Sequence, residues 1–433
     1  MDLLLEAEAG TLNKRLNAFG HKFPNIGNVC VALHQNNSVV NARLGVEGTN
    51  PLVAIGCLAK VFTATLISQL ISQSTLNLNE NIAELLPIDD GKVRACFSGV
   101  TLRHLMNNTH GLDGPIPLTA PIATTGFIDI QMLCDILSSA PPLAEPGEVY
   151  NCTNAGAYLA AAIIECTCGR PFRDVLYHEL LKPLSVATTE SIANLALGLP
   201  AVCPATGGQL LLPVCGISEF INYHLGRVTV GEKSHQRALN CLLEESHPLP
   251  GWHPLESAAG LVWKQFHSGW YGHDGRWLGN SVVVRLHPRR GIAIIITGEI
   301  HRGDPTIRIL ANLFGDLFPE LVTCEVPQLL TKEENRALEL ERYVGRYKSS
   351  SGCLAVTQEG DQLNICATHN PESNPPIRVP VTSHRLRGAK QHVFWTDPPE
   401  LHALPFVQFV SPLHDRGFEY IWNGRNVWRR VDR

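Results

Sequence analysis

The feature that most constrains this chain is a Cys-x-x-Lys motif, formed by Cys57 and Lys60, at the junction between a loop and an apolar segment. Residues 50–56 contain Pro and Gly and predict a loop, whereas residues 61–67 are mostly apolar and predict a helix. Positions i and i+3 of a helix share one face, so the thiol and the amine are expected to point the same way. The sequence therefore predicts a buried helix that begins with this pair.

The pair has a chemical and a structural interpretation. A thiol at a helix N-terminus beside a cation ionises more easily, because the helix dipole and the ammonium group both favour the thiolate. An activated nucleophile is built in this way. In the structural interpretation Cys57 is a small buried apolar residue and Lys60 a solvated helix residue. The flanking sequence decides in favour of the chemical interpretation.

Residues 54–65 resemble the nucleophile helix of the serine β-lactamase and penicillin-binding-protein superfamily, in its branch of class C β-lactamases, DD-peptidases, esterases and transacylases. That family carries Ser-x-x-Lys at this point. The resemblance therefore makes Cys57 the replacement of the nucleophilic Ser and retains Lys60. Residues 76–87 and 100–112 are similar to the family segments that follow.

The second family motif is Tyr-x-Asn, six residues after the Pro of a Pro-Gly-Glu signature, and here Pro146 leads to Cys152 and Asn154 at those positions. The resemblance thus retains Asn154 and replaces the motif Tyr by Cys152. Tyr150 stands two residues early, so it is expected to contact substrate rather than to take the motif role. The thiol of Cys152 either moves protons in place of the Tyr, opens space for a larger substrate, or is a spectator.

The third motif, Lys-Thr-Gly or His-x-Gly in the family, has two candidates, which begin at His267 and His273. The family places a Gly six residues after the motif His and a turn Pro fifteen residues after it. From His273 these positions hold Gly279 and Pro288, whereas from His267 they hold His273 and Val282. The spacing selects His273.

The resemblance implies that the three motifs meet in one site between a helical region and a sheet. The side chains expected to act in catalysis are Cys57, Lys60, Asn154, His273 and Cys152. The residues expected to bind substrate are Asp274, Gly275 and Tyr150. Attack of the Cys57 thiol on an acyl carbonyl would give a thioester, while Lys60 accepts or holds the thiol proton.

The remaining roles follow from the same resemblance. The backbone N–H groups of Cys57 and Arg276 would form an oxyanion hole. Asn154 would donate a hydrogen bond to the substrate or to Lys60. His273 would supply positive charge or a donor opposite the nucleophile.

A thioester reacts readily with amines and thiols, so acyl transfer stands beside hydrolysis. The sequence predicts a cysteine-nucleophile acyltransferase or acyl hydrolase for a small ester, thioester or amide, with specialised-metabolite biosynthesis as one setting. No cofactor or metal is expected. Three alternatives remain: a binding scaffold without catalysis, a zinc site of Cys57, Cys152 and His273, and a redox-active disulfide between the two cysteines. Retention of Lys60, Asn154 and His273 favours catalysis.

The net charge and the cysteine content limit which partners and which cellular compartment are expected. The net charge of −5 and the pI of about 6.4 give no reason to expect nucleic acid or an anionic membrane. No apolar run reaches the length of a membrane span. Thirteen cysteines, an odd number, and an acidic N-terminus without an export signal predict a cytoplasmic protein. The predicted partner is a small-molecule acyl substrate, and the oligomeric state is not specified by the sequence.

The expected architecture is α+β: an antiparallel sheet flanked by helices with an all-helical region, followed by a small antiparallel β-barrel. The expected domains are a β-lactamase-like catalytic domain over 1–328, a charged linker over 329–340 and a lipocalin-like barrel over 341–433. Runs of β-branched residues and turn signals predict strands over 29–33, 39–44, 281–286 and 291–297. Helices are expected over 1–20 and 306–317.

Overall fold

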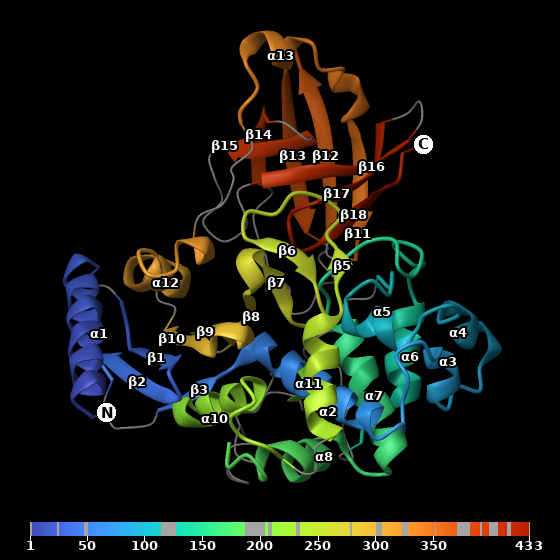
Figure 1. The fold of residues 1–433 in the computed structure, drawn as a ribbon. Helices are drawn as coiled ribbons and strands as arrows, with labels where there is room; N and C mark the ends of the chain where they lie inside the picture. Colours follow the sequence, from blue (N-terminus) through green and yellow to red (C-terminus); the bar gives the residue numbers. More distant parts are fainter. Residues whose placement is uncertain are drawn as a thin grey trace.

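The computed structural model describes residues 2–23, 26–46, 51–113, 127–186, 204–206, 210–230, 234–277, 279–299, 305–322, 328–350, 352–369, 382–389, 392–397, 406–413 and 417–432. Its architecture confirms the expected α+β fold, with a central antiparallel sheet, helices on both sides of it and a separate barrel near the C-terminus (Figure 1). In the described part of the chain, no helix is both long enough and apolar enough to cross a membrane.

The central sheet has eight strands within the described residues, in the order β2-β1-β10-β9-β8-β7-β6-β5, and every neighbouring pair is antiparallel. The strands are β1 (Val29–Gln35), β2 (Ser38–Leu44), β5 (His247–Pro248), β6 (Glu256–Ala259), β7 (Lys264–Phe266), β8 (Tyr271–Trp277), β9 (Asn280–His287) and β10 (Ile292–Glu299). The predicted hairpins β1–β2 and β9–β10 are both present. Strands β9 and β10 are buried on both faces, which explains their continuous runs of Val and Ile.

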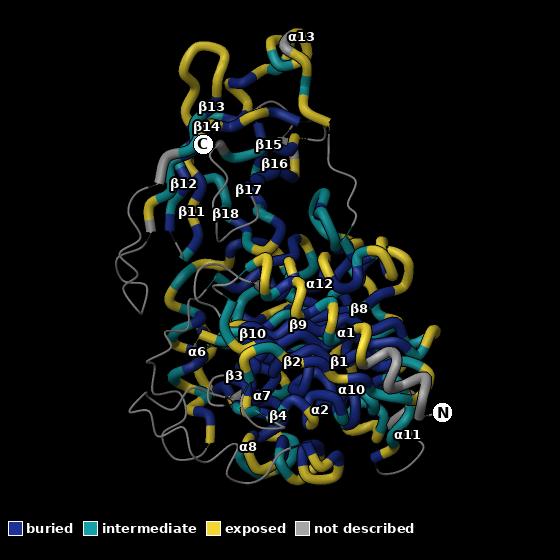
Figure 2. The backbone as a smooth tube through the Cα atoms, turned by 90° about the vertical axis from the view of Figure 1, so that its left-hand side faces the viewer, coloured by how far each residue is buried: buried dark blue, intermediate teal, exposed yellow. Residues whose placement is uncertain are grey.

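Two groups of helices cover the sheet. Helices α1 (Asp2–Lys22) and α12 (Pro305–Phe314) pack on one face, where Leu16 and Ile309 share a core with Ile294. The opposite face carries a larger core that contains Ile295 and residues of the helical region. Figure 2 shows the sheet as the buried centre of this domain. The expected N-terminal helix and the helix after β10 are therefore confirmed, with α12 ending three residues early, at Phe314.

The helical region holds the first two motifs. Its helices are α2 (Ala59–Ser72), α3 (Ile82–Leu85), α4 (Gly91–Cys96), α5 (Leu102–Met106), α6 (Ile130–Ser138), α7 (Ala155–Cys168), α8 (Phe172–Val175), α10 (Val214–His224) and α11 (Ser234–Glu244). A short ladder joins β3 (Leu52–Ala54) to β4 (Leu211–Pro213). Helix α7 is buried over its first eleven residues, Ala155–Glu165, so its small Ala side chains allow α2 and α5 to pack closely against it.

The C-terminal part forms a closed barrel. Its strands are β11 (Gly345–Ser349), β12 (Gly352–Glu359), β13 (Gln362–His369), β14 (Thr382–Gly388), β15 (Val393–Asp397), β16 (Phe406–Leu413), β17 (Gly417–Trp422) and β18 (Val427–Arg430). Helix α13 (Lys332–Arg336) precedes it and is capped by the Thr331 side chain. The interior holds stacked and edge-on rings, with Tyr343 against Phe394, Phe409 and Phe418.

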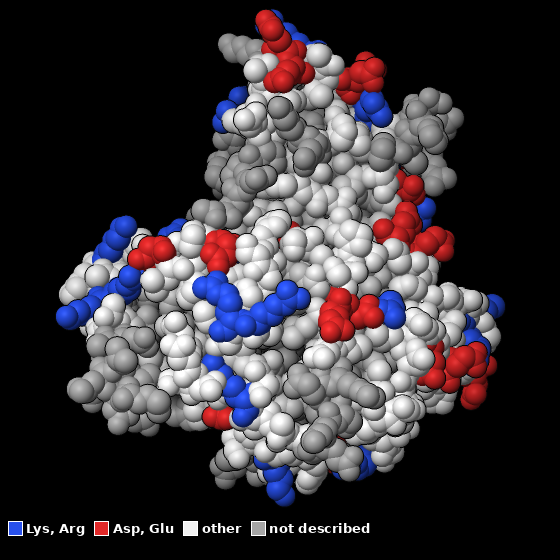
Figure 3. All heavy atoms as spheres, in the orientation of Figure 1, with Lys and Arg blue, Asp and Glu red and all other residues white. Residues whose placement is uncertain are grey.

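One end of the barrel rests on the N-terminal domain. Tyr420, Trp422 and Val427 of the barrel share a hydrophobic cluster with Tyr150 and with Ala259 of β6. In Figure 1 the strands β5 and β6 run up to this end of the barrel. Figure 3 shows that basic and acidic side chains lie close to one another on the displayed face.

Candidate active site

Cys57 lies in a single 3-10 turn, Gly56–Leu58, that leads directly into α2. This turn touches the edge of β8, since a Cβ atom on Gly56 would lie 2.5 Å from the backbone nitrogen of Arg276. A Cβ on Gly275 would overlap the carbonyl oxygen of Ile55. Two glycines therefore let the nucleophile turn and the third motif approach backbone to backbone, as the predicted oxyanion hole requires. The Cys57 side chain itself remains half-buried.

Lys60 is buried on the first turn of α2, and its Nζ donates a hydrogen bond of 3.1 Å to the carbonyl oxygen of Thr153. This contact joins the first motif to the second. Of the two partners expected for Asn154, the substrate and Lys60, this contact leaves the substrate, because Lys60 donates to the Thr153 carbonyl. Asn154 begins α7 without a side-chain cap bond, and no hydrogen bond joins its side chain to any other described residue.

A buried histidine that the sequence did not single out supports Thr153. The Nδ1 of His110 accepts from the backbone N–H of Leu112 at 3.1 Å, so its Nε2 carries the proton that the Thr153 hydroxyl oxygen accepts at 3.2 Å. Burial, assisted by His104 and Lys60, lowers the pKa of His110 to about 4. His110 is therefore neutral near pH 7 and acts as a fixed donor behind the second motif.

Cys152 sits between the catalytic part and the barrel. Its backbone N–H donates to the carbonyl of Arg425 at 3.0 Å, and its own carbonyl accepts from Asn426 Nδ2 at 3.0 Å. Burial raises the pKa of the Cys152 thiol, but the positive charges of Lys60, Arg425 and Lys264 outweigh burial and bring it to about 7. A substantial fraction of this thiol is therefore ionised at neutral pH.

Tyr150 does not line open space. Its side chain is 4% exposed and belongs to the cluster between β6 and the barrel. Burial and the neighbouring Cys152 thiolate raise the pKa of Tyr150, and its hydroxyl forms a hydrogen bond with the Cys152 sulfur. The structure thus places Tyr150 behind Cys152, whereas the sequence predicted a direct contact with substrate.

His273 is uncharged, which corrects the expectation of a positive group. Burial, together with the charges of Lys264 and Lys60, lowers its pKa to about 3. Its Nδ1 lies 2.9 Å from the carbonyl oxygen of Asp274, and because a carbonyl only accepts, Nδ1 carries the proton. The Nε2 atom is therefore a hydrogen-bond acceptor, not a second donor.

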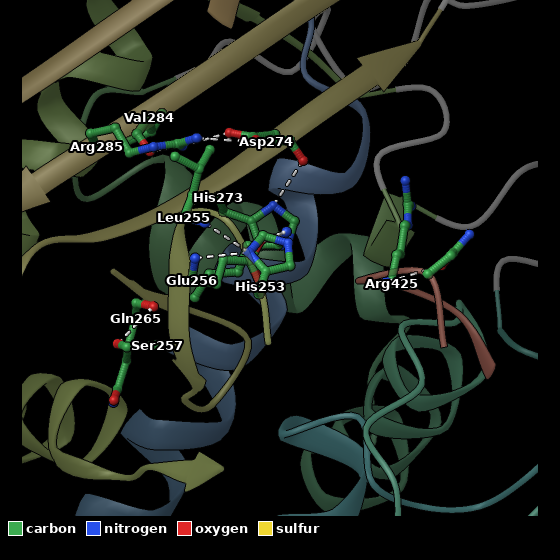
Figure 4. Close-up of polar contacts among 12 residues, drawn as sticks. His253, Leu255, Glu256, Ser257, Gln265, His273, Asp274, Val284, Arg285 and Arg425 are labelled. Atoms are coloured by element: carbon green, nitrogen blue, oxygen red, sulfur yellow. Dashed lines mark hydrogen bonds and ion pairs between the residues drawn. The ribbon is translucent and has the colours of Figure 1, made fainter. Parts of the chain in front are cut away.

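Asp274 is engaged in an ion pair with Arg285 on the neighbouring strand β9. Their side chains meet at 2.5 Å and 3.3 Å (Figure 4). The guanidinium, 1% exposed, also stacks on Phe266. Burial opposes ionisation of Asp274, but Arg285 outweighs it and lowers the pKa to about 2. Successive strand residues face opposite sides, so Asp274 lies on the face of β8 away from His273. Asp274 therefore has a structural partner, which the motif resemblance did not predict.

A second ion pair lies on β6 and β7, where Lys264 Nζ contacts Glu256 Oε1. The Nδ1 of His253 accepts from the backbone N–H of Glu256 at 2.8 Å, and its Nε2 lies 3.6 Å from the Glu256 carboxylate (Figure 4). Burial lowers the pKa of His253 to about 4, so it faces the carboxylate as a neutral donor. No motif in the sequence marks these three residues, and only their place on strands beside the third motif could have drawn attention to them.

The barrel contributes Arg425, from the turn between β17 and β18. Its side chain is exposed to solvent and forms a hydrogen bond with the Cys152 sulfur, and the negative charges of Cys152 and Cys57 raise the pKa of its guanidinium. Both cysteines of the site therefore lie within reach of one cation from the other domain. Sequence reasoning missed this residue because it belongs to a segment far from the three motifs.

The zinc site and the redox-active disulfide, two of the three alternatives, can be compared with the positions of the side chains. Among the described residues, no group of three or more His, Cys, Asp or Glu side chains is placed to hold a metal ion. Cys57 and Cys152 are both free thiols. Two of the predicted catalytic residues lie near Lys60, because its positive charge lowers the pKa of both Cys152 and His273.

The chain is similar to known proteins in sequence and in structure. Residues 24–195 match the family model described as Beta-lactamase. Penicillin-binding protein 4 of Amycolatopsis lactamdurans is 24% identical over 359 residues, which cover 74% of this chain and 91% of that protein.

Solved structures share the fold. The structure of SurE with D-Leu has a TM-score of 0.74 at 19% identity and covers 98% of this chain and 100% of that one. The octameric penicillin-binding protein homologue from Pyrococcus abyssi has a TM-score of 0.57 at 16% identity, with 99% and 100% covered. A class C β-lactamase has a TM-score of 0.57 at 15% identity, with 71% and 96% covered. The first two matches extend over the barrel as well.

Proposed function

This chain belongs to the serine β-lactamase and penicillin-binding-protein-like superfamily, and on that premise we propose that it transfers acyl groups through a thioester on Cys57. The observation that carries the proposal is the meeting of the Cys57 turn, the buried Lys60 and the ionised Cys152 in one place. A thiol nucleophile beside a second thiol that titrates near neutrality has both a bond-forming atom and a proton acceptor.

The steps balance without any added reagent. Cys57 Sγ attacks the acyl carbonyl while its proton passes to the Cys152 thiolate. The oxyanion that forms is held by the backbone N–H groups of Cys57 and Arg276. When the bond to the leaving group breaks, the Cys152 thiol returns the proton to that group. An amine, thiol or water then attacks the thioester, gives up its proton by the same route and frees Cys57.

Lys60 and His273 assist without changing their charge. Lys60 is held by the Thr153 carbonyl, so its ammonium stays beside the reacting thiols and stabilises negative charge on either of them. The neutral His273 offers Nε2 as an acceptor, which suits an N–H or O–H of the incoming acceptor or leaving group. Asn154 makes no side-chain hydrogen bond to another described residue, which supports a role in binding a substrate amide.

Arg425 gives the substrate a chemical class. An accessible guanidinium next to both thiols favours a molecule that carries a carboxylate close to its reacting atom. Free amino acids have this form, with an amine acceptor and a carboxylate, and the structurally similar SurE has been solved with D-Leu. We therefore infer small acyl thioesters or esters as donors and amino-acid-like amines as acceptors, with hydrolysis as the competing outcome.

Intact-mass measurement tests the proposal. Wild-type protein is incubated with a panel of acyl thioesters and esters, and an acyl adduct is expected that maps to Cys57. Cys57→Ala should give no adduct and lower turnover on the order of 10⁴-fold or more. Cys215→Ala, which removes an exposed thiol, is the matched control and should leave both unchanged. Full turnover by Cys57→Ala would exclude the thioester route, and ligand binding without any adduct would indicate a binding scaffold.

A further inference from the structure

The ion pair between Glu256 and Lys264 is built into the hairpin next to the third motif. In the β6–β7 ladder, Glu256 pairs with Phe266 and Ala259 pairs with Lys264, with a register shift after Glu256. Because Lys264 and Phe266 are two residues apart, their side chains and those of their partners share one face of the ladder. The Lys264 ammonium therefore reaches Glu256 along this face, and the two groups are in contact.

One position of this ladder borders the second motif. Ala259, directly opposite Lys264, belongs to the cluster that contains Tyr150, and Cys152 packs against that cluster. Lys264 therefore lies beside a ladder position that borders this cluster, and its charge acts on the Cys152 thiol. Burial opposes the charge of Lys264, but Glu256 outweighs it and raises the pKa of the ammonium. Lys264 therefore stays protonated near neutral pH, and its charge acts on Cys152.

The charged and titratable groups around Cys152 come from several elements. Cations are supplied by Lys60 of α2, Lys264 of β7 and Arg425 of the barrel turn, while Glu256 of β6 is the anion and Tyr150 is a neutral donor. His273 adds no charge. Of the three cations, Lys60 donates to the Thr153 carbonyl and Arg425 is exposed to solvent. Lys264 is the one held by a buried carboxylate.

We propose that Lys264, fixed by Glu256, is a positioning residue that, together with Lys60 and Arg425, keeps Cys152 ionised as the proton acceptor of the site. A buried ammonium close to a thiol stabilises the thiolate because few water molecules screen the two charges. The proton step, from the Cys57 thiol to the Cys152 thiolate and on to the leaving group, rests on the proposed function. The ionisation of Cys152 by Lys264 does not, and it can be measured without any substrate.

The measurement is the pH dependence of Cys152 alkylation by iodoacetamide, resolved by peptide mass spectrometry, in protein that carries Cys57→Ala. The parent is expected to react with a midpoint near pH 7. Lys264→Met should raise the midpoint by about one unit or more, which slows alkylation at neutral pH about fivefold or more. Lys264→Arg should restore the midpoint, since it keeps the charge. Lys348→Met, on an exposed position of β11, is the matched control and should change nothing.

An unchanged Cys152 midpoint in a folded Lys264→Met protein would overturn the proposal. If that variant does not fold, Lys264→Gln, which can still donate to Glu256, is read in the same way. With Cys57 present, Lys264→Met should lower kcat roughly tenfold and leave KM nearly unchanged, and Lys264→Arg should recover it. A Lys264-dependent midpoint without any Cys57 adduct would refute the acyl-transfer function and support the role of Lys264.

Discussion

The backbone N–H of Cys152 donates a hydrogen bond of 3.0 Å to the carbonyl oxygen of Arg425. The contact joins the second motif to the last hairpin of the barrel. It is reinforced by Asn426, whose side chain donates to the Cys152 carbonyl, and by the Tyr420 hydroxyl, which donates to Glu148 at 3.0 Å. Because these bonds surround the residues of the motif, the barrel is part of the scaffold that holds the active-site backbone.

Arg425→Ala is expected to weaken binding of substrates or acceptors that carry a carboxylate. A charge-assisted hydrogen bond contributes roughly 1.5–3 kcal/mol, so KM should rise about tenfold to a hundredfold. The check is steady-state kinetics with a free carboxylate and with its methyl ester. Arg346→Ala, at an exposed barrel position, is the control. An equal loss for both the acid and the ester would contradict the assignment.

Gly56→Ala should separate the nucleophile turn from the third motif. Gly56 has φ of +51°, and a methyl group there would lie 2.5 Å from the Arg276 nitrogen, so the two backbones must move apart. Loss of an oxyanion donor costs about 10²–10³ in kcat. Kinetics and iodoacetamide labelling of Cys57 are measured together, and labelling should persist while kcat falls. Retained kcat in this variant would place the oxyanion elsewhere.

His110→Ala should destabilise the protein as well as slow it. The change leaves the Leu112 N–H and the Thr153 hydroxyl without their buried partner, which costs about 1–3 kcal/mol. Urea unfolding measures the loss. His110→Asn, which can still accept and donate, should recover part of it. Since Thr153 holds Lys60, the Ala variant is also expected to lower kcat, and a variant with full stability and full kcat would show that His110 is a spectator.

Protonation of His273 should make the fold sensitive to acid. Its pKa is about 3 in the folded protein and roughly 6.5 when unfolded, so below pH 6.5 the unfolded state binds a proton that the folded state does not. The contribution of His273 to stability is therefore complete above pH 6.5 and is lost progressively as the pH falls toward 3. The buried His110, His253 and His224, each with a pKa of about 4, act in the same direction.

The variant His273→Asn isolates the contribution of His273 to the pH dependence of stability. Between about pH 7 and 5, wild type should lose about 2 kcal/mol more unfolding free energy than the variant does. Urea unfolding at the two pH values provides the measurement. The ion pair of Asp274 does not interfere, because its pKa of about 2 places its loss at lower pH. Identical pH slopes for the two proteins would mean that the pKa of His273 is the same in the folded and the unfolded state.

Local patterns explain why much of the fold was predictable. The hairpin of β9 and β10 depends on residues that are neighbours in the sequence, namely two apolar runs and the turn at Pro288 between them. It therefore follows from strand propensity and burial. The three motifs are also local, and their spacing placed Cys57, Asn154 and His273 on elements that do converge. Where the sequence failed, the missing information concerned neighbours: Lys60 bonds to Thr153 and Tyr150 is covered by the barrel.

By itself, the sequence determined the order of helices and strands and the presence of a barrel, and it supplied the side chains that we propose to be reactive. Only the tertiary structure decided their charges. It made His273 neutral, lowered the pKa of Cys152 to about 7 and surrounded that thiol with Lys264 and Arg425. The physical reason is that secondary structure depends on residues a few positions apart, whereas ionisation depends on burial and on charges that distant segments bring within a few ångströms.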